Sequence, residues 1–244
     1  MKHLFQLFVV LLFLLVAMPA SARVYLVAVG ISDDAGTEND LNCPVRNANA
    51  IADVYLKQDP NMVCTRIFNE QATTENILLT VSRVFSHADT NDIIVLFIGG
   101  HGYTGGYMTY DGYLDYGRLR QAMAASRSRH KIIFADTCHS GTLRSEKKSR
   151  KNRKLSARFS DVMLFLSSRN DEYSWEGGAI NMGHFSFYLS KGLGGAADAD
   201  GNNIITAREI FKYVNSSVAD FSGGKQHPVM WGKFSDDMPV VYLK

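Results

Sequence analysis

The sequence lacks several features that would define common classes of protein. After its first 22 residues it has no apolar segment of about 20 residues, the length that a membrane-spanning helix needs. Its three cysteines and seven histidines show neither Cys-x-x-Cys nor His-x-x-x-His spacing, so we expect no metal centre of the zinc type. It has no internal repeat. Its one strongly biased segment, the basic tract Arg144–Lys154, has no interleaved aromatic residues, so we do not expect nucleic acid binding.

The one long apolar run lies at the amino terminus. Met-Lys-His is followed by the apolar stretch Leu4–Ala17 and then by Ala20-Ser21-Ala22, the small residues that a signal peptidase accepts. The run is too short to span a membrane comfortably, so an uncleaved anchor is the less favoured alternative. We expect residues 1–22 to be a signal peptide. The protein would then be exported to a periplasm or out of the cell, without stable membrane association.

Cysteine is scarce and its count is odd. Cys43, Cys64 and Cys138 allow at most one disulfide, and a Cys43–Cys64 pair is the one that leaves Cys138 free. The alternative is that Cys43 and Cys64 are both buried thiols that pack as small apolar side chains. The sequence leaves these two possibilities open.

The mature chain alternates strand and helix patterns. Its length fits one large domain better than two small ones. Continuous apolar runs predict buried strands, and apolar residues at helical spacing predict helices. Asp111-Gly112 lies between two alternating segments and predicts a hairpin turn. The predicted strands are Val24–Gly30, Met62–Phe68, Ile93–Ile98, Lys131–Ala135 and Val162–Leu166, and the predicted helices are 47–57, 74–85, 116–125, 184–193 and 206–218. This order indicates an α/β fold with a parallel sheet.

Two of these strands end in residues that can carry chemistry. Ile93–Ile98 is followed by Gly99-Gly100-His101-Gly102, and Lys131–Ala135 by Asp136-Thr137-Cys138. Ligands of open α/β sheets bind at the carboxyl ends of strands, so the two ends can converge. A neighbouring imidazolium lowers the pKa of a thiol and favours the nucleophilic thiolate. We therefore predict that His101 is a general base and Cys138 a nucleophile.

The motifs resemble those of caspase-like cysteine peptidases. A buried strand ending in His-Gly, then a strand ending in Asp-x-Cys-x-Ser-Gly, is similar to the pattern of the metacaspase branch, whereas the caspase signature Gln-Ala-Cys-x-Gly is absent. Ser167-Ser168-Arg169, Gly183–Leu189 and Gln226–Val229 support the resemblance. It implies a His101/Cys138 dyad, with the amides of Gly102 and Cys138 as the oxyanion hole.

The resemblance also implies the domain organisation. We expect a three-layer caspase-like domain over residues 23–244, with a central, mostly parallel sheet flanked by helices. Its parts would be a large-subunit-like region 23–143, a basic linker 144–154 and a small-subunit-like region 155–244. The resemblance to metacaspases implies a monomer, in contrast to the obligate dimers of caspases. We expect this monomer to act on proteins or peptides.

The resemblance further implies a preference for arginine or lysine at P1, the residue before the scissile bond. Asp136 would favour a cation beneath the pocket. The second acid of metacaspases falls at Asn47, which weakens this expectation, and Asp33 or Asp34 could compensate. Asp136 could instead be a structural cap.

The basic linker contains candidate sites for self-processing. Such a pocket would accept its cationic side chains, and the alternative is an exposed loop that is never cut. The candidates are Arg144, Lys147, Lys148, Arg150, Lys151, Arg153 and Lys154.

No cofactor is required for this chemistry, although one segment imitates a calcium loop. Asp198–Glu209 has oxygen-bearing side chains at positions 1, 3, 5 and 12, but Asn203 replaces the glycine at position 6. We favour a turn that caps the following helix over a calcium site.

Two other functions remain open: a non-catalytic caspase-like peptide-binding module, and a protease of this fold with a different P1 specificity, such as an asparagine-specific or gingipain-like enzyme.

Overall fold

A six-stranded sheet forms the centre of the protein. The computed structural model describes residues 22–33, 40–103, 105–137, 161–169, 171–177 and 180–244. The strand order is β12-β8-β7-β3-β1-β2, and all neighbours are parallel except β12, which runs antiparallel to β8. The strands are β1 (Val24–Gly30), β2 (Val63–Phe68), β3 (Ile93–Gly100), β7 (His130–Thr137), β8 (Val162–Leu166) and β12 (Val229–Trp231).

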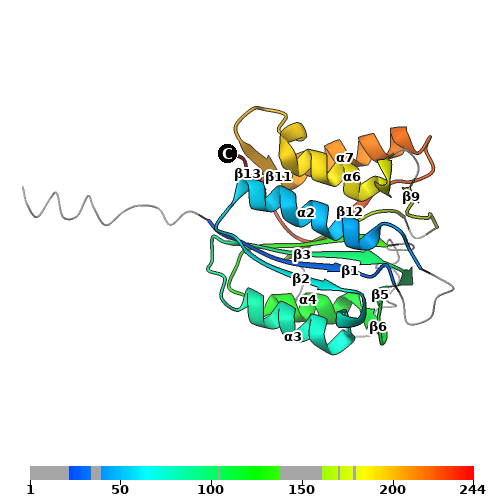
Figure 1. Ribbon diagram of the computed structural model, residues 1–244. Coiled ribbons are helices and arrows are strands. Elements are labelled where there is room, and N and C mark those ends of the chain that lie inside the picture. Colours follow the sequence, from blue (N-terminus) through cyan, green and yellow to red (C-terminus); the bar gives the residue numbers. More distant parts are fainter. Residues whose placement is uncertain (1–21, 34–39, 104, 138–160, 170, 178–179) are drawn as a thin grey trace, which may run out of the picture.

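Helices cover both faces of this sheet (Figure 1). α2, α6 and α7 lie on one face, and α3 and α4 on the other. The helices are α2 (Pro44–Gln58), α3 (Thr74–Phe85), α4 (Tyr116–Ala124), α6 (His184–Lys191) and α7 (Ala207–Phe221). The predicted three-layer α/β fold with a mostly parallel sheet is therefore confirmed.

The composition of the strands explains why the sheet lies at the centre. Every residue of β1 is buried. Leu26 and Ala28 face the core beneath α2, α6 and α7, whereas Val27 and Val29 face the core beneath α3 and α4. Successive side chains of a strand point to opposite faces, so a continuous apolar run is what a doubly covered strand requires. Each fully buried aliphatic side chain contributes about 1.5–3 kcal/mol.

The helix boundaries follow from local caps. The Thr73 side chain accepts a hydrogen bond from the Asn76 amide at the start of α3, so Thr73 is the N-cap of this helix. Thr206 and Glu209 form a reciprocal capping box at the start of α7. The α-helix predicted over 184–193 is two residues shorter in the structure. α6 stops at Lys191, and Gly192–Ala196 continues as a π-helical turn in which Gly195 has φ 121°.

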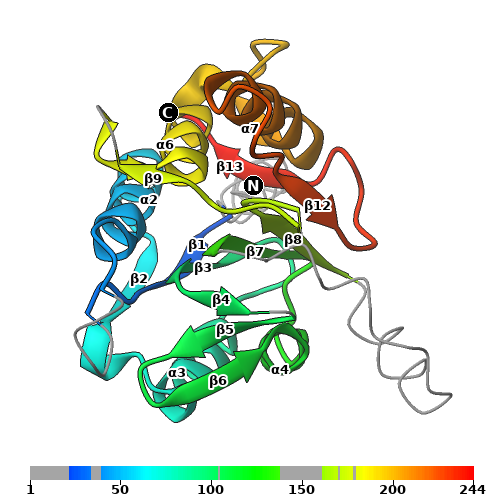
Figure 2. The ribbon, with the colours of Figure 1, turned by 90° about the vertical axis from the view of Figure 1, so that its right-hand side faces the viewer.

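Three smaller sheets surround the central one. β4, β5 and β6 form a meander below the carboxyl ends of β3 and β7 (Figure 2). Its hairpin pairs Thr109 with Gly112, so the loop is Tyr110-Asp111, one residue earlier than predicted, and Gly112 belongs to the strand. The short strands are β4 (Gly102–Tyr103), β5 (Gly106–Thr109), β6 (Gly112–Asp115), β9 (Glu176–Gly177), β10 (Met182–Gly183), β11 (Ile204–Thr206) and β13 (Pro239–Tyr242).

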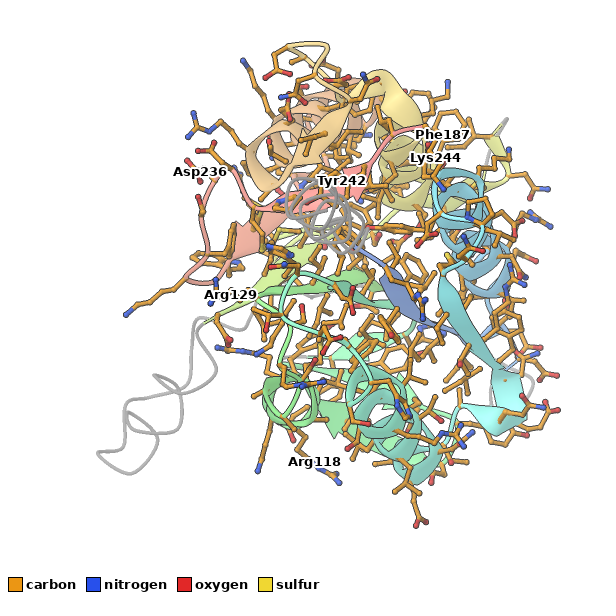
Figure 3. The ribbon with its side chains drawn as sticks, turned by 90° about the vertical axis from the view of Figure 1, so that its left-hand side faces the viewer. Arg118, Arg129, Phe187, Asp236, Tyr242 and Lys244 are labelled. Atoms are coloured by element: carbon orange, nitrogen blue, oxygen red, sulfur yellow. The ribbon has the colours of Figure 1, made fainter. Side chains whose placement is uncertain are left out.

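The amino ends of the strands lie on the side shown in Figure 3, where the labelled Arg129 immediately precedes β7. Lys131, at the start of β7, is buried, and its Nζ lies 2.8 Å from Oδ2 of Asp161. Asp161 immediately precedes β8. The ion pair therefore fixes the start of β8 next to the start of β7. Thr137, where β7 stops, lies at the other end of the sheet.

Cys43 and Cys64 are not joined by a disulfide. Cys43 is the N-cap residue of α2, next to the carboxyl end of β1, whereas Cys64 pairs with Leu26 near the amino end. Cys43 is buried and Cys64 is exposed on the edge strand. The predicted disulfide is therefore absent, and the alternative of two buried thiols holds for Cys43 but not for Cys64.

Within the described residues, no helix combines the length and hydrophobicity of a membrane span.

Candidate active site

His101 follows the carboxyl end of β3, and its backbone is held in place by the β4–β6 meander. Gly100 has φ 152°, and a Cβ at this position would lie 3.2 Å from the Tyr107 ring. The buried Tyr107 hydroxyl donates to the Gly99 carbonyl at 3.1 Å, and the Met108 amide donates to the His101 carbonyl at 3.0 Å. Because the ring fills the space that a side chain would need, Gly100 allows close contact between β3 and this tyrosine.

The end of β7 is held equally firmly. The buried Thr137 amide donates to Oγ of Ser167 at 3.2 Å, and that hydroxyl donates to the Thr137 carbonyl at 3.0 Å. The Thr137 side chain shares a hydrogen bond of 2.9 Å with the buried Tyr116 hydroxyl. Cys138, the next residue, lies outside the described residues. The structure thus defines the position from which the predicted nucleophile follows.

The two strand ends are direct neighbours. Gly100 pairs with Thr137 in the parallel register of β3 and β7. These two residues immediately precede His101 and Cys138 in the sequence. Neighbouring strands lie about 4.8 Å apart, so the residues from which the predicted dyad follows lie side by side.

Gly102, the predicted oxyanion donor, lies in β4 opposite Tyr107. The hydrogen bond from Met108 to the His101 carbonyl flanks this pair, which makes it a non-hydrogen-bonded pair of the antiparallel ladder. In such a pair the amides point away from the partner strand. The Gly102 N–H is therefore directed away from β5, as donation to a substrate oxygen requires.

Asp136 is buried next to this centre and accepts three hydrogen bonds. Ser174 donates to Oδ1 at 2.6 Å, Ser186 to Oδ2 at 2.6 Å, and the Asn47 amide to Oδ2 at 3.3 Å. Burial raises the pKa of the Asp136 carboxyl, while the hydrogen bonds from Ser174 and Ser186 act in the opposite direction. No Lys or Arg among the described residues pairs with it. Its hydrogen bonds therefore come from neutral donors, and the charged form of His184 is a favourable electrostatic neighbour that also lowers the pKa of Asp136.

Asn47 and Gly183 complete the surroundings of this carboxylate. Asn47 is buried on α2, and its Oδ1 accepts from the Gly183 amide at 3.1 Å. A Cβ on Gly183 would collide with Asp136 Oδ2, so only glycine allows this close approach. Gly30 similarly lets the start of α2 pack on β1, where an added Cβ would lie 2.8 Å from the Pro44 carbonyl oxygen. These contacts bring Asn47 to the strand ends.

A pocket opens at this point. Three parts of the chain form it: Leu41, Pro44 and Asn47 around the start of α2, Gly100, Asp136 and Thr137 at the strand ends, and Ser174 and Glu176 before and in β9. None of these described lining residues is basic. The structure thus brings together the predicted substrate-binding residues Asp136 and Asn47. Asp34 lies outside the described residues, and Asp33 is exposed and does not line the pocket.

Sequence reasoning missed three residues of the site. Ser174, Ser186 and Glu176 are distant in sequence from the strand ends and belong to no pattern that indicates a pocket. The one available signal was for Ser186, which lies within Gly183–Leu189, one of the segments that supported the resemblance.

The calcium-like segment forms a closed turn. Carboxylate oxygens of Asp198, Asp200 and Glu209 lie within 4.8 Å of one another. Asn203 adopts φ 63°, so it takes the left-handed conformation usually assigned to glycine at position 6. Asp198 accepts from the amides of Gly201, Asn202 and Asn203, and Glu209 accepts from those of Ala199 and Thr206. These bonds form the turn that leads into α7, and the same three carboxylates are a group that could hold a metal ion.

The fold and the site are those of an α/β protein with a histidine and a cysteine at neighbouring strand ends. Gly100 and Thr137 pair on adjacent parallel strands, and they immediately precede His101 and Cys138. The chain belongs to the caspase-domain family of cysteine-type peptidases, whose model matches residues 23–238. Among solved structures, it is similar in fold to protein GSU0716 from Geobacter sulfurreducens, with 15% identity and a TM-score of 0.64, over 91% of this chain and 100% of that chain. No curated protein matches the chain.

Proposed function

We propose that this protein is an exported cysteine endopeptidase of the metacaspase type that cleaves after arginine or lysine, with Cys138 as nucleophile and His101 as its acid–base partner. The observation that carries the proposal is the register pairing of Gly100 with Thr137, the residues that precede His101 and Cys138. Membership of the caspase-domain family supports it independently.

The proposed reaction is acyl transfer. The Cys138 sulfur attacks the scissile carbonyl carbon, and a C–S bond forms as the carbonyl oxygen becomes an oxyanion. The amides of Gly102 and Cys138 donate to that oxyanion. His101, which holds the thiol proton, gives it to the leaving amine as the C–N bond breaks. Water, deprotonated by His101, then attacks the thioester carbonyl carbon, and a C–O bond forms as the C–S bond breaks. The acid leaves, and His101 returns the proton to the Cys138 sulfur.

The environment of Asp136 supports the preference for a basic P1 side chain. A buried carboxylate without a cationic partner is costly, because neutral hydrogen bonds replace only part of its hydration. Asp136 has three neutral side-chain donors and lines a pocket in which none of the described lining residues is basic. A guanidinium or ammonium group entering the pocket would supply the missing positive charge.

A P1-varied peptide library tests the proposed function. We expect the mature protein to hydrolyse arginine and lysine peptides at least about 10-fold faster than the others, the difference that one charge-assisted hydrogen bond makes. Fast cleavage after another residue would favour a caspase-fold protease of different specificity. Binding without turnover would favour the non-catalytic module.

We also propose that the linker 144–154, which lies outside the described residues, is cut by the enzyme itself. A cut there leaves every described strand pairing intact, and β7 and β8 remain hydrogen-bonded neighbours on either side of it. The core beneath α2, α6 and α7 likewise contains residues from both sides, such as Tyr55 and Phe185.

The expected product is two chains that stay together as one particle. We predict that wild-type protein shows a new amino terminus after one of the linker Lys or Arg residues, while size-exclusion chromatography gives the mass of the uncut form. Cys138→Ala protein should remain uncut, and Cys64→Ala, which alters an exposed thiol, should be cut normally. A cut that persists in Cys138→Ala would rule out self-processing.

A further inference from the structure

We propose that Glu176 is a second acidic specificity determinant, which holds a P1 arginine together with Asp136. The inference rests on the proposed function and deepens it. The sequence has Asn47 where a second acid was expected, but the pocket contains a carboxylate from a different part of the chain. Glu176 and Asp136 both line it, 40 positions apart in the sequence.

The position of Glu176 is set by its backbone and by one side-chain hydrogen bond. The adjacent Trp175 amide donates to the buried Gln226 side chain at 3.1 Å, and the Trp175 carbonyl accepts from the His184 amide at 2.9 Å. Oε1 of Glu176 accepts from the Asn42 amide at 3.2 Å. The carboxylate thus connects β9 to the segment before α2, across the pocket that both segments line.

Its available hydrogen-bonding capacity separates Glu176 from Asp136. A carboxylate has about four acceptor sites. Asp136 already accepts from the side chains of Ser174, Ser186 and Asn47, and the Ser186 amide also interacts with it, which leaves it at most about one. Glu176 accepts one hydrogen bond, from Asn42, among the described residues. Most of the acceptor capacity for an entering cation is therefore on Glu176.

The acceptor capacities of Asp136 and Glu176 together favour arginine over lysine as the P1 side chain. A guanidinium carries five N–H donors in a rigid, planar fork, whereas an ammonium carries three that rotate freely. Asp136 alone can satisfy about one more donor. A P1 arginine therefore needs Glu176 more than a P1 lysine does, and the loss of its charge should weaken arginine substrates most.

Glu176→Gln tests the inference, because glutamine retains an oxygen acceptor for the Asn42 amide while removing the charge. The substrates are matched peptides with arginine, lysine or citrulline at P1, citrulline being the neutral isostere of arginine. We expect kcat/KM for the arginine peptide to fall about 10-fold, mainly through KM, with a smaller fall for lysine and less than about 2-fold for citrulline. The salt dependence of kcat/KM for arginine should also weaken. Glu75→Gln, on α3 in the opposite helical layer, is the matched control and should change none of these values.

The same substitution is also measured by binding, so that the test does not depend on turnover. The arginine and citrulline peptides are titrated into Cys138→Ala protein with and without Glu176→Gln. We expect the affinity for the arginine peptide to fall about 10-fold and that for citrulline to stay constant. An equal change for both peptides, no change for arginine, or no binding of the arginine peptide to Cys138→Ala would overturn the role of Glu176. Wild-type protein that binds the arginine peptide selectively but never hydrolyses it would instead overturn the proposed function.

Discussion

Replacing His101 with alanine is expected to lower kcat about 1,000-fold for peptides with arginine at P1, because a general acid–base group typically contributes 10²- to 10⁴-fold. Cys138→Ala should lower it by on the order of 10⁴-fold or more, since no covalent intermediate can form. The structural reason is the register of β3 and β7, in which Gly100 and Thr137 are partners at the strand ends.

The double substitution provides the sharpest form of this prediction. Residues that act as one catalytic unit are strongly non-additive, so His101→Ala added to Cys138→Ala should cost almost nothing further. Active-site titration with a thiol alkylating agent gives a second measurement, in which His101→Ala should slow modification of Cys138 relative to wild type. His87→Ala and Cys64→Ala change an exposed histidine and an exposed cysteine, and both should leave kcat and the thermal midpoint unaltered. Hydrolysis that survives in both single variants of the dyad would refute the proposed mechanism.

The parts of the site that could be predicted are those built into continuous apolar strands. Val24–Gly30 and Val162–Leu166 were predicted with the bounds that the structure has, because a strand buried on both faces must be apolar throughout. β3 and β7 extend two residues further than predicted, to Gly100 and Thr137, where glycine and polar residues break the apolar run but backbone pairing continues.

The surroundings of Asp136 could not be predicted in the same way. Its three hydrogen-bond donors are separated from it by 38 residues for Ser174, 50 for Ser186 and 89 for Asn47. Local periodicity carries no information on such contacts, because they depend on how helices and loops pack over the strand ends. β9 and β10, which bring Glu176 and Gly183 to the pocket, contain two residues each and are too short to show any alternation.

The hairpin illustrates a smaller error of the same origin. Asp-Gly is a strong turn signal, but the pairing of Thr109 with Gly112 moves the loop to Tyr110-Asp111. The Asp111 carboxylate accepts from the Thr74 amide at 2.7 Å and from the Thr109 hydroxyl at 3.0 Å. A tertiary contact with α3 therefore fixes the register that the dipeptide alone would place one residue later.

Replacing Asp136 with asparagine should have the second-largest effect on activity. We expect kcat/KM for arginine and lysine peptides to fall on the order of 100-fold at neutral pH, since a buried charge-assisted contact is lost. The citrulline peptide should be much less affected. Asp33→Asn is the matched control, because Asp33 is exposed and does not line the pocket. An equal loss for arginine and citrulline would show that Asp136 supports the fold of the pocket without recognising a cation.

The pH dependence of this variant follows from the direction of the Asp136 pKa shift. Burial raises the pKa of this carboxyl in the native protein, so on acidification it becomes neutral earlier than an exposed aspartate would. Affinity for arginine peptides should therefore increase as pH rises through the raised pKa, and Asp136→Asn should abolish that limb of the pH profile.

Stability should respond in the opposite sense to affinity. Because the native state holds the Asp136 proton more tightly than the unfolded state, the stabilisation from this group is present below the unfolded pKa and is lost as pH rises through the native one. Above its raised native pKa, the ionised, buried Asp136 carboxylate therefore favours unfolding. Asp136→Asn should have a thermal midpoint at neutral pH no lower than that of wild type, and the difference between the two should disappear in acid. A variant that is clearly less stable at neutral pH would contradict this account and assign Asp136 to the structural role of a cap.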